Sequence, residues 1–368
     1  MNSRTRNPVI CSVALFTAAT LLTSCSSPQK DSATFDADGT AHITRIIPMP
    51  STVSPEGQKW LESLTHMKRG PQSLAEQRKG TDAWRAEGTA EARKYFPANV
   101  EEKIIAGVRT DIITPLEMPE ANRNRVFINL HGGGFVTDSG SLIEGIPIAN
   151  LAKTKVVSVY YRLAPEYPFP AAVDDVVAVY KELLKDYKPQ NIGIFGTSAG
   201  GILTAEVAVR LKQLGEPMPA ALGLFSILAD FTRPADSQNF FTLDGLPGGL
   251  APQYPNQAHD SSYFGKTDPK DPVLSPMFAD LHGMPPTLLV TGTRDALLSN
   301  TALFHLALLR AGNDARLLVY EAMPHAFWYH FQLAETQDAL QQMAKFFDEK
   351  VIAEKPLAKP STATKPAK

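Results

Sequence analysis

Cysteine is scarce in this sequence, which has only two cysteines, Cys11 and Cys25, among its 368 residues. Cys11 lies in an N-terminal apolar stretch with the character of a cleavable export signal, so we expect it to be removed. The mature chain then keeps one cysteine and cannot form an internal disulfide. With 43% hydrophobic residues, the chain has the composition of a globular protein that is held together by its core.

An excess of positive charge is also absent. The chain has 36 Lys and Arg against 38 Asp and Glu, which gives a formal net charge of -2. Loss of Arg4 and Arg6 with the leader would leave 34 basic residues against 38 acidic ones, or -4. Nucleic-acid binding depends on clustered basic residues, so we expect no nucleic-acid partner.

The first 25 residues contain two arginines and then an apolar stretch of about 14 residues, which suits a signal peptide and is too short to span a bilayer. The stretch ends in Leu-Thr-Ser-Cys at residues 22–25, which resembles the lipobox of bacterial lipoproteins. The resemblance implies that residues 1–24 are cleaved and that Cys25 receives a lipid anchor. Because Ser26 stands where aspartate would suggest retention in the inner membrane, the expected location is the periplasmic face of the outer membrane. An ordinary secreted protein with an incidental cysteine is the alternative.

Both ends of the mature chain lack apolar periodicity. Residues 25–45 are polar and small, which indicates a tether between the lipid and the folded domain. Residues 353–368 form a run of Pro, Lys, Ala and Thr, for which we expect disorder. The chemistry is therefore expected between these two segments.

Short apolar runs alternate with amphipathic stretches along the middle of the chain. This pattern predicts an α/β protein with a mostly parallel, doubly wound sheet and helices on both faces. Buried strands are expected at residues 126–130, 156–160, 192–195, 221–228, 287–291 and 316–320, and helices at 171–187, 199–215, 301–312 and 335–350.

Two segments depart from the alternation. Residues 54–95 carry mixed helical patterns, and we expect residues 46–100 to form a small helical cap before a catalytic domain at 101–352. Residues 231–272 are rich in Pro, Gly and aromatic residues and have no clear period. Both segments are candidates for a lid over the edge of the sheet where function is expected.

One serine lies at the junction of an expected strand and an expected helix, within the run Gly-Thr-Ser-Ala-Gly at residues 196–200. A sharp turn from strand to helix is strained and closely packed, so only small residues can flank the serine. The hydroxyl of Ser198 would project from the carboxyl edge of the sheet, near the positive end of the helix dipole. A plain turn can carry the same pattern, but the neighbouring strand and helix favour a nucleophile.

A serine becomes an effective nucleophile when a histidine that is oriented by an acid takes its proton. In a sheet of this kind, the acid and then the histidine follow later strands. Asp295 and His325 each come shortly after an expected strand, in that order. Asp230 and Glu321 are the alternative acids. The spacing of the remaining histidines does not suggest metal ligation, and we expect neither a metal nor an organic cofactor.

Three consecutive glycines follow His131, directly after the expected strand at 126–130. Attack on an ester carbonyl places negative charge on oxygen, and each backbone N–H aimed at that charge contributes about 10²- to 10³-fold in rate. The main chain can approach a substrate closely where no Cβ stands in the way, so glycines suit such a loop. A phosphate-binding turn is the alternative, but the run lacks the spacing and the lysine of such sites. The expected oxyanion donors are Gly133, Gly134 and Ala199, and the expected loop-shaping residues are His131 and Gly132.

With these residues, the sequence from about residue 125 to 350 resembles the hormone-sensitive-lipase-like esterases, the bacterial family IV branch of the α/β hydrolases. The most specific likeness is Tyr-Tyr-Arg-Leu-Ala-Pro-Glu at 160–166, continued by Pro-Phe-Pro-Ala-Ala-Val-Asp-Asp at 168–175. The Gly-Thr-Ser-Ala-Gly motif at 196–200 resembles the motif of one of the two subgroups of that family. The resemblance implies an α/β hydrolase fold and activity on esters of short or medium acyl chains. The sequence departs from the family pattern at Ile202, Ala296, Ser299 and Ala326, and none of these is an expected catalytic residue.

These observations predict a serine ester hydrolase that acts on a small-molecule ester through an acyl-enzyme. A long-chain lipase at the membrane is one alternative. A binding lipoprotein that uses the same fold without catalysis is another, because a fold does not determine a function. A binder would need neither the three side chains nor the glycine loop, so their joint presence favours the enzyme.

Overall fold

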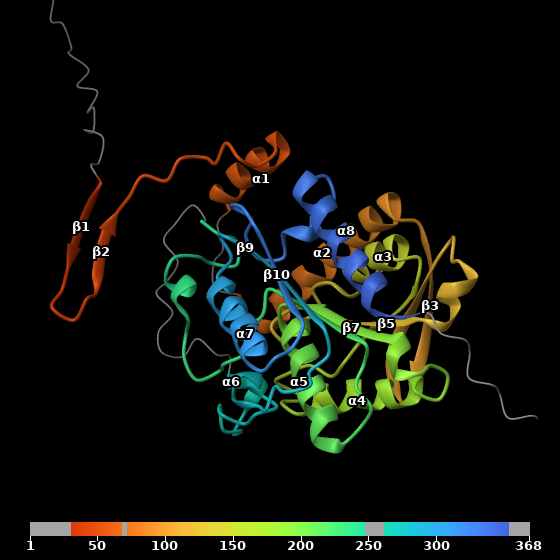
Figure 1. Ribbon diagram of the computed structural model, residues 1–368. Helices are drawn as coiled ribbons and strands as arrows, with labels where there is room; N and C mark the ends of the chain where they lie inside the picture. The colour runs from red at the N-terminus through yellow and green to blue at the C-terminus, as the bar shows by residue number, and fades with distance from the viewer. Residues whose placement is uncertain (1–30, 68–71, 247–260, 353–368) are drawn as a thin grey trace, which may run out of the picture. The chain divides into compact units, whose positions relative to one another are not determined.

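The computed structural model describes residues 31–67, 72–246 and 261–352 (Figure 1). The expected leader at 1–24, the lipidation candidate Cys25 and the expected disordered tail at 353–368 lie outside the described residues. The chain divides into two units after Met49, and each unit is considered by itself below. In the described part of the chain, no helix combines the length and the apolar character needed to cross a bilayer.

The N-terminal unit contains a two-stranded antiparallel hairpin of β1 (Ser32–Phe35) and β2 (Ala41–Thr44). Gly39 occupies the turn with a φ of 89°, a conformation that glycine adopts without strain. The hairpin falls within the segment expected as a tether, where the sequence analysis anticipated no strands. Its side chains are almost all exposed, which is why the hydrophobic pattern did not mark them as buried strands.

The second unit is built around an eight-stranded sheet in the order β10-β9-β8-β7-β5-β6-β4-β3. The six strands from β5 to β10 are parallel to one another, and β4 runs antiparallel to β6 and to β3. All six strands expected from the sequence are present. The strands are β3 (Ala98–Ile105), β4 (Val108–Pro115), β5 (Val126–Leu130), β6 (Lys155–Val159), β7 (Ile192–Thr197), β8 (Ala221–Phe225), β9 (Thr287–Gly292) and β10 (Ala315–Tyr320).

Helices cover both faces of this sheet, as the sequence pattern predicted (Figure 1). On β5, Ile128 and Leu130 belong to the cluster shared with α4, α5 and α7, whereas Phe127 faces α3 and α8 and lies 5.0 Å from the ring of Phe347. Full burial of such a side chain contributes about 1.5–3 kcal/mol to folding. The helices are α3 (Ser141–Leu151), α4 (Ala171–Leu183), α5 (Ala199–Leu214), α6 (Ser261–Phe264), α7 (Leu298–Arg310) and α8 (Ala334–Lys350). Short 3₁₀ turns are η1 (Glu120–Asn124), η2 (Pro189–Asn191), η3 (Asp236–Asn239), η4 (Pro276–Phe278) and η5 (Phe327–Tyr329).

Two helices precede the sheet, α1 (Pro55–Thr65) and α2 (Leu74–Tyr95), within the segment expected as a cap. Ser73 begins α2 in a capping box with Glu76. Halfway along α2, a Cβ on Gly88 would lie 2.5 Å from Cδ1 of Ile143, so this glycine allows α2 to pack closely on α3. Helix α2 therefore lies on the α3 side of the sheet.

The crossover connections change direction between β5 and β7, which are neighbours in the middle of the sheet. The chain leaves β5 through α3 toward β6 on one side, and it leaves β7 through α5 toward β8 on the other. In open α/β sheets, ligands bind in the crevice at the carboxyl ends of such a pair of strands. The glycine run at 132–134 follows the carboxyl end of β5, and Ser198 follows the carboxyl end of β7.

Candidate active site

Ser198 lies on the strained turn that joins β7 to α5. Its backbone has φ 57° and ψ -123°, a conformation that a non-glycine residue adopts only when its surroundings impose it. The backbone N–H of Ser198 donates to the carbonyl of Phe225 at 2.8 Å, which ties the turn to the end of β8. This geometry is the one expected for a nucleophile between a strand and a helix.

The two glycines that flank this turn are required by sterics. A Cβ on Gly200 would lie 1.8 Å from the carbonyl oxygen of Leu130, and a Cβ on Gly196 would lie 2.3 Å from the same atom. Both contacts are with backbone, which cannot rotate away. The close approach of α5 to β5 therefore depends on glycine at both positions.

His325 and Asp295 meet at the carboxyl edge of the sheet. Nδ1 of His325 lies 3.1 Å from Oδ1 of Asp295, and both side chains are almost fully buried. Asp295 also accepts hydrogen bonds from the backbone of Leu297 at 2.8 Å and from Thr291 Oγ1 at 2.9 Å. Ser226 Oγ makes a further, very short hydrogen bond to its second carboxylate oxygen.

These contacts determine the ionisation state of Asp295. Burial by itself would raise the pKa of this carboxyl group, but the neighbouring imidazole of His325 and the hydrogen bonds from His325, Ser226 and Leu297 outweigh burial. The pKa of Asp295 therefore lies below its ordinary value, and the group is a carboxylate at neutral pH.

The two alternative acids have other surroundings. Asp230 accepts from the backbone and the hydroxyl of Thr232 and pairs with Arg233 at 3.4 Å. In the described part of the chain, neither Asp230 nor Glu321 makes a hydrogen bond to His325. Of the three acids, Asp295 is the one that the structure brings to the imidazole.

Ser198 and His325 belong to loops at the same edge of the sheet. Trp328, three residues after His325, donates its Nε1–H to Oγ1 of Thr197 at 3.0 Å, and Thr197 directly precedes Ser198. Among the described residues, no hydrogen bond joins Ser198 Oγ to the imidazole. Catalytic hydrogen bonds of this kind often form only when substrate is bound.

Close contacts, a left-handed backbone or both favour glycine at the three positions after His131. A Cβ on Gly132 would lie 3.0 Å from the carbonyl oxygen of Thr197, and a Cβ on Gly133 would lie 2.2 Å from the carbonyl oxygen of Thr137. Gly133 and Gly134 have φ values of 110° and 61°. Within the described ranges, no protein group accepts a hydrogen bond from the N–H groups of Gly133, Gly134 or Ala199. All three donors are therefore available to a ligand.

Aromatic contacts hold this glycine loop in place, and the sequence analysis did not identify them. The ring of Phe135, which has a φ of 65°, stacks on Tyr263 with 3.5 Å between ring centroids. The imidazole of His131 stacks on Tyr161 at 4.1 Å, and Tyr161 donates its hydroxyl to the carbonyl of His131 at 2.6 Å. Tyr263 comes from α6, more than a hundred residues away, so no local pattern could reveal this contact.

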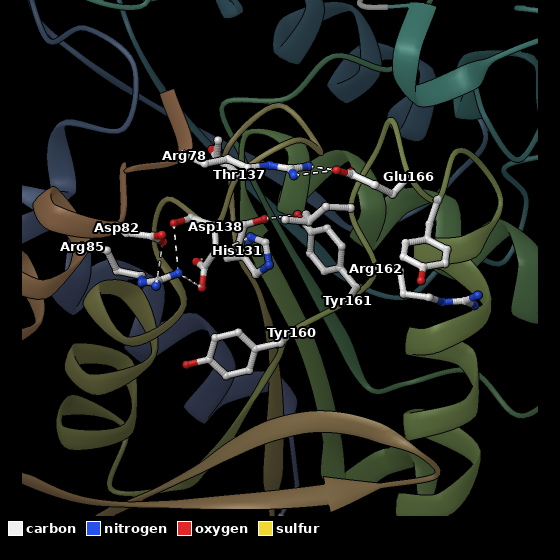
Figure 2. A pocket seen from close by; sticks show the side chains of 12 residues that line it. Arg78, Asp82, Arg85, His131, Thr137, Asp138, Tyr160, Tyr161, Arg162 and Glu166 are labelled. Carbon is white, nitrogen blue, oxygen red and sulfur yellow. Dashed lines mark hydrogen bonds and ion pairs between the residues drawn. The ribbon is translucent and has the colours of Figure 1, made fainter. Parts of the chain in front are cut away.

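A cavity of about 400 Å³ lies beside the same loop, between α2 and the segment that follows β6 (Figure 2). Among the lining residues, Arg78 makes two hydrogen bonds of 2.7 Å to the carboxylate of Glu166, and Arg85 pairs with Asp138 at 2.6 Å. His131 also lines the cavity, whereas the three proposed catalytic side chains do not. Helix α2 is thus joined by ion pairs to the loops around the glycine run.

Metal ligation has no visible basis in the described ranges, where no group of three or more His, Cys, Asp or Glu side chains is arranged to hold an ion. What the arrangement can do chemically follows from its parts. A serine at a strained turn, an imidazole oriented by a carboxylate and free backbone donors together suit nucleophilic attack on a carbonyl group.

Comparison with known proteins identifies the family of this chain. Residues 127–329 match a protein family described by the alpha/beta hydrolase fold. The chain belongs to this family. An esterase of Acinetobacter venetianus is 30% identical to this α/β hydrolase over 272 residues, which cover 69% of this chain and 84% of the relative.

Solved structures of esterases share the fold of this α/β hydrolase. The crystal structure of an esterase called E25 superposes with a TM-score of 0.73 at 33% identity and covers 84% of this chain and 98% of its own. An esterase from the bacterial hormone-sensitive lipase family gives a TM-score of 0.68 at 30% identity, with 81% and 99% of the two chains covered. The α/β hydrolase fold expected from the sequence is confirmed, and the protein is an ester hydrolase similar to the hormone-sensitive-lipase-like esterases.

Proposed function

We propose that this ester hydrolase is a serine carboxylesterase of the Gly-Thr-Ser-Ala-Gly subgroup, with Ser198 as nucleophile, His325 as base and Asp295 as the acid that orients the base. The observation that carries the proposal is the buried Asp295–His325 pair, at the sheet edge where the strained Ser198 turn begins. The carboxylate accepts from Nδ1–H of His325, which leaves Nε2 as the nitrogen that can take a proton.

In the first half of the proposed reaction, Nε2 of His325 takes the hydroxyl proton of Ser198 while Oγ bonds to the ester carbonyl carbon. The carbonyl oxygen becomes an oxyanion, which the N–H groups of Gly133, Gly134 and Ala199 stabilise. The C–O bond to the alcohol then breaks, and the alcohol leaves with the proton from His325. The product of this half is an acyl-enzyme on Ser198.

In the second half, His325 takes a proton from water, and the resulting hydroxide bonds to the acyl carbon. The same N–H groups stabilise the second oxyanion. The bond to Ser198 Oγ breaks, His325 returns the proton to the serine, and the carboxylic acid is released. No step needs a metal ion or an organic cofactor.

A substitution at the nucleophile tests this proposal. We expect wild type to hydrolyse p-nitrophenyl esters with a burst of p-nitrophenol, and Ser198→Ala to lose the burst and nearly all turnover. A fluorophosphonate should add to Ser198 in wild type, as mass spectrometry of the labelled peptide would show. Ser63→Ala, a change of an exposed serine on α1, is the matched control and should retain full activity. Activity that survives Ser198→Ala would refute the nucleophile, and a wild type that is inert on every ester would favour the non-catalytic binder.

Short or medium acyl chains are the proposed substrates, on the basis of the resemblance to hormone-sensitive-lipase-like esterases. A series of p-nitrophenyl esters from acetate to palmitate measures this preference. We expect kcat/KM to fall toward the long chains. A rise with chain length, together with faster turnover on emulsions, would instead favour a long-chain lipase at the membrane.

The location of the enzyme is a separate proposal that rests on the sequence alone. Cleavage before Cys25 and lipidation of its thiol would anchor the protein on the periplasmic face of the outer membrane. Cells fed labelled palmitate should incorporate the label into wild type and not into Cys25→Ala. A Cys25→Ala protein that is labelled and fractionates with membranes would refute the anchor.

A further inference from the structure

A carboxyl group is buried directly beneath the candidate active site. Glu144 lies on α3 with none of its surface exposed, and its carboxyl group meets Oγ1 of Thr197 in a very short hydrogen bond. Nδ2 of Asn129 donates to the other carboxyl oxygen of Glu144 at 3.0 Å. Thr197 accepts in turn from Nε1 of Trp328 at 3.0 Å, so Glu144 stands at the centre of a buried polar network.

Each partner in this network belongs to a different part of the candidate active site. Thr197 is the last residue of β7 and directly precedes the nucleophile, and Asn129 lies on β5 two residues before His131. Trp328 lies on η5, three residues after the proposed base. One carboxyl group therefore connects the nucleophile strand, the oxyanion strand and the loop of the base, although none of its atoms lines the site.

The network is too complete to be an incidental buried polar group. Ser158 Oγ on β6 donates to Oδ1 of Asn129 at 3.0 Å. Both the amide oxygen and the amide nitrogen of Asn129 are therefore hydrogen-bonded. Thr197, Asn129 and Trp328 are all at most 1% exposed. An apolar core at this position would pack without any of these groups, and a partly satisfied network would cost stability. The pairing of Asn129 and Thr197 with Glu144 and with their other partners indicates that the arrangement of the connected loops is what the network preserves.

We propose that Glu144 is a positioning residue, which holds the Ser198 turn, the oxyanion loop and the His325 loop in their mutual arrangement through Thr197 and Asn129. This inference rests on the proposed function and extends it. Misplacement of reacting groups by about 1 Å can reduce turnover about 100-fold, so a residue that fixes three loops affects kcat more than substrate binding.

The protonation state of Glu144 bears on the same argument. Burial raises the pKa of Glu144 to about 8, and the hydrogen bonds from Thr197 and Asn129 offset this only in part. The titratable groups that interact with it are the phenols of Tyr161 and Tyr329, whose own pKa values burial raises well above 10. Near neutral pH the carboxyl group of Glu144 is therefore mostly uncharged.

Two charged groups on elements that pack against α3 have partners of their own. Arg85 of α2 pairs with Asp138, and Asp111 of β4 accepts from the hydroxyl of Tyr160. Neither neighbour supplies a counter-ion to Glu144. When the pH rises above about 8, the new charge on Glu144 stays uncompensated and opposes the oxyanion, so kcat should fall on the alkaline side.

Three substitutions test the proposal, with kcat and KM measured for p-nitrophenyl butyrate from pH 6 to 10 and active sites counted with a fluorophosphonate. Glu144→Leu and Thr197→Val remove the network with little change in shape. We expect each to lower kcat per titrated site about 10- to 100-fold, with KM within about 2-fold of wild type. Glu144→Gln keeps the shape of the side chain and cannot ionise, and it can still accept from Asn129 with its amide oxygen and donate an amide N–H to Oγ1 of Thr197. It should retain neutral-pH kcat within about 3-fold and lose the alkaline decline.

The matched control is Thr287→Val, which removes an equally buried threonine hydroxyl at the opposite edge of the sheet, where it donates to the carbonyl of Pro285. It should lower the melting temperature and leave kcat per titrated site unchanged. Wild-type kcat in Thr197→Val, or an unchanged alkaline decline in Glu144→Gln, would overturn the proposal. If Glu144→Leu does not fold, these two variants still decide it. A wild type without ester turnover or phosphonate labelling would instead refute the proposed function.

Discussion

The imidazole of His325 and the carboxylate of Asp295 form a buried pair with 3.1 Å between Nδ1 and Oδ1. The other carboxylate oxygen is held by Ser226 at the end of β8 and by Thr291 on β9. Hydrogen bonds from residues of two neighbouring strands therefore hold the carboxylate of Asp295 in position against the imidazole of His325. Its orientation determines which nitrogen of His325 carries the proton, and everything proposed for Ser198 depends on that tautomer.

Asp295→Asn should lower kcat about 10⁴-fold, because an amide in this position stabilises the wrong tautomer of the imidazole and cannot stabilise its charged form. The measurement is the steady-state hydrolysis of p-nitrophenyl butyrate. Asp230→Asn is the matched control, since Asp230 is similarly buried and bonds to Thr232 and Arg233 instead. Equal losses in the two variants would contradict the assignment of Asp295.

Ser226→Ala should destabilise the protein by about 1–3 kcal/mol at neutral pH, because it removes a hydrogen bond to a buried carboxylate. The low pKa of Asp295 contributes stability above the ordinary pKa of an aspartate, and this contribution is lost as the pH falls through the folded-state pKa. The difference between wild type and Ser226→Ala should therefore shrink in acid. Denaturant unfolding from pH 7 to 3 measures it.

Ser275→Ala is the control for that experiment. Ser275 is also fully buried, but its hydroxyl donates to the backbone carbonyl of Pro269 and not to a titratable group. Its destabilisation should keep the same size across the pH range. If the two variants respond alike, the loss in Ser226→Ala does not arise from the charge of Asp295.

Gly133→Ala and Gly134→Ala should differ strongly although the two glycines are neighbours. At Gly133 the added Cβ would lie 2.2 Å from a backbone oxygen, so the loop must move and the oxyanion donors are displaced, with an expected loss in kcat of about 10²- to 10³-fold. At Gly134 the nearest atom is 4.0 Å away, and only the left-handed backbone costs about 1–2 kcal/mol. Steady-state kinetics and melting temperatures measure the contrast. Similar kcat values for the two variants would argue against this loop as the oxyanion hole.

The stability of wild type should depend on the ionisation of Glu144. Its pKa is raised from 4.5 to about 8 in the folded protein, so the stabilising contribution of its neutral form is complete below pH 4.5 and is lost as the pH rises through 8. Between these values the free energy of unfolding of wild type should fall, relative to Glu144→Gln, by up to about 1.4 kcal/mol per pH unit. Urea unfolding of both proteins from pH 5 to 9 measures the slopes. Parallel curves would show that this carboxyl group does not titrate as described.

Much of the fold was predictable from local sequence patterns. The six strands from β5 to β10 are short apolar runs buried on both faces, and such runs are visible without knowledge of their neighbours. The strands β3 and β4 were missed because β3 is largely exposed and polar and because β4, although mostly buried, carries Arg109, Thr110 and Asp111, so neither forms a continuous apolar run. Helix α3 was missed as well, because it is buried nearly all round and contains Pro147, and so shows no clear amphipathic period.

The amino-acid sequence by itself determined where the backbone turns sharply and which residue types could do chemistry there. Glycines at 132, 133, 196 and 200 are needed where main chain approaches main chain, and that requirement is local enough to read along the chain. Tertiary structure alone decided which of several acids meets His325, because that depends on the order of the strands in the sheet. It also joined Glu144 to Thr197 across 53 residues and Ser226 to Asp295 across 69. Such contacts arise from the burial of polar groups against one another, and no local periodicity records them.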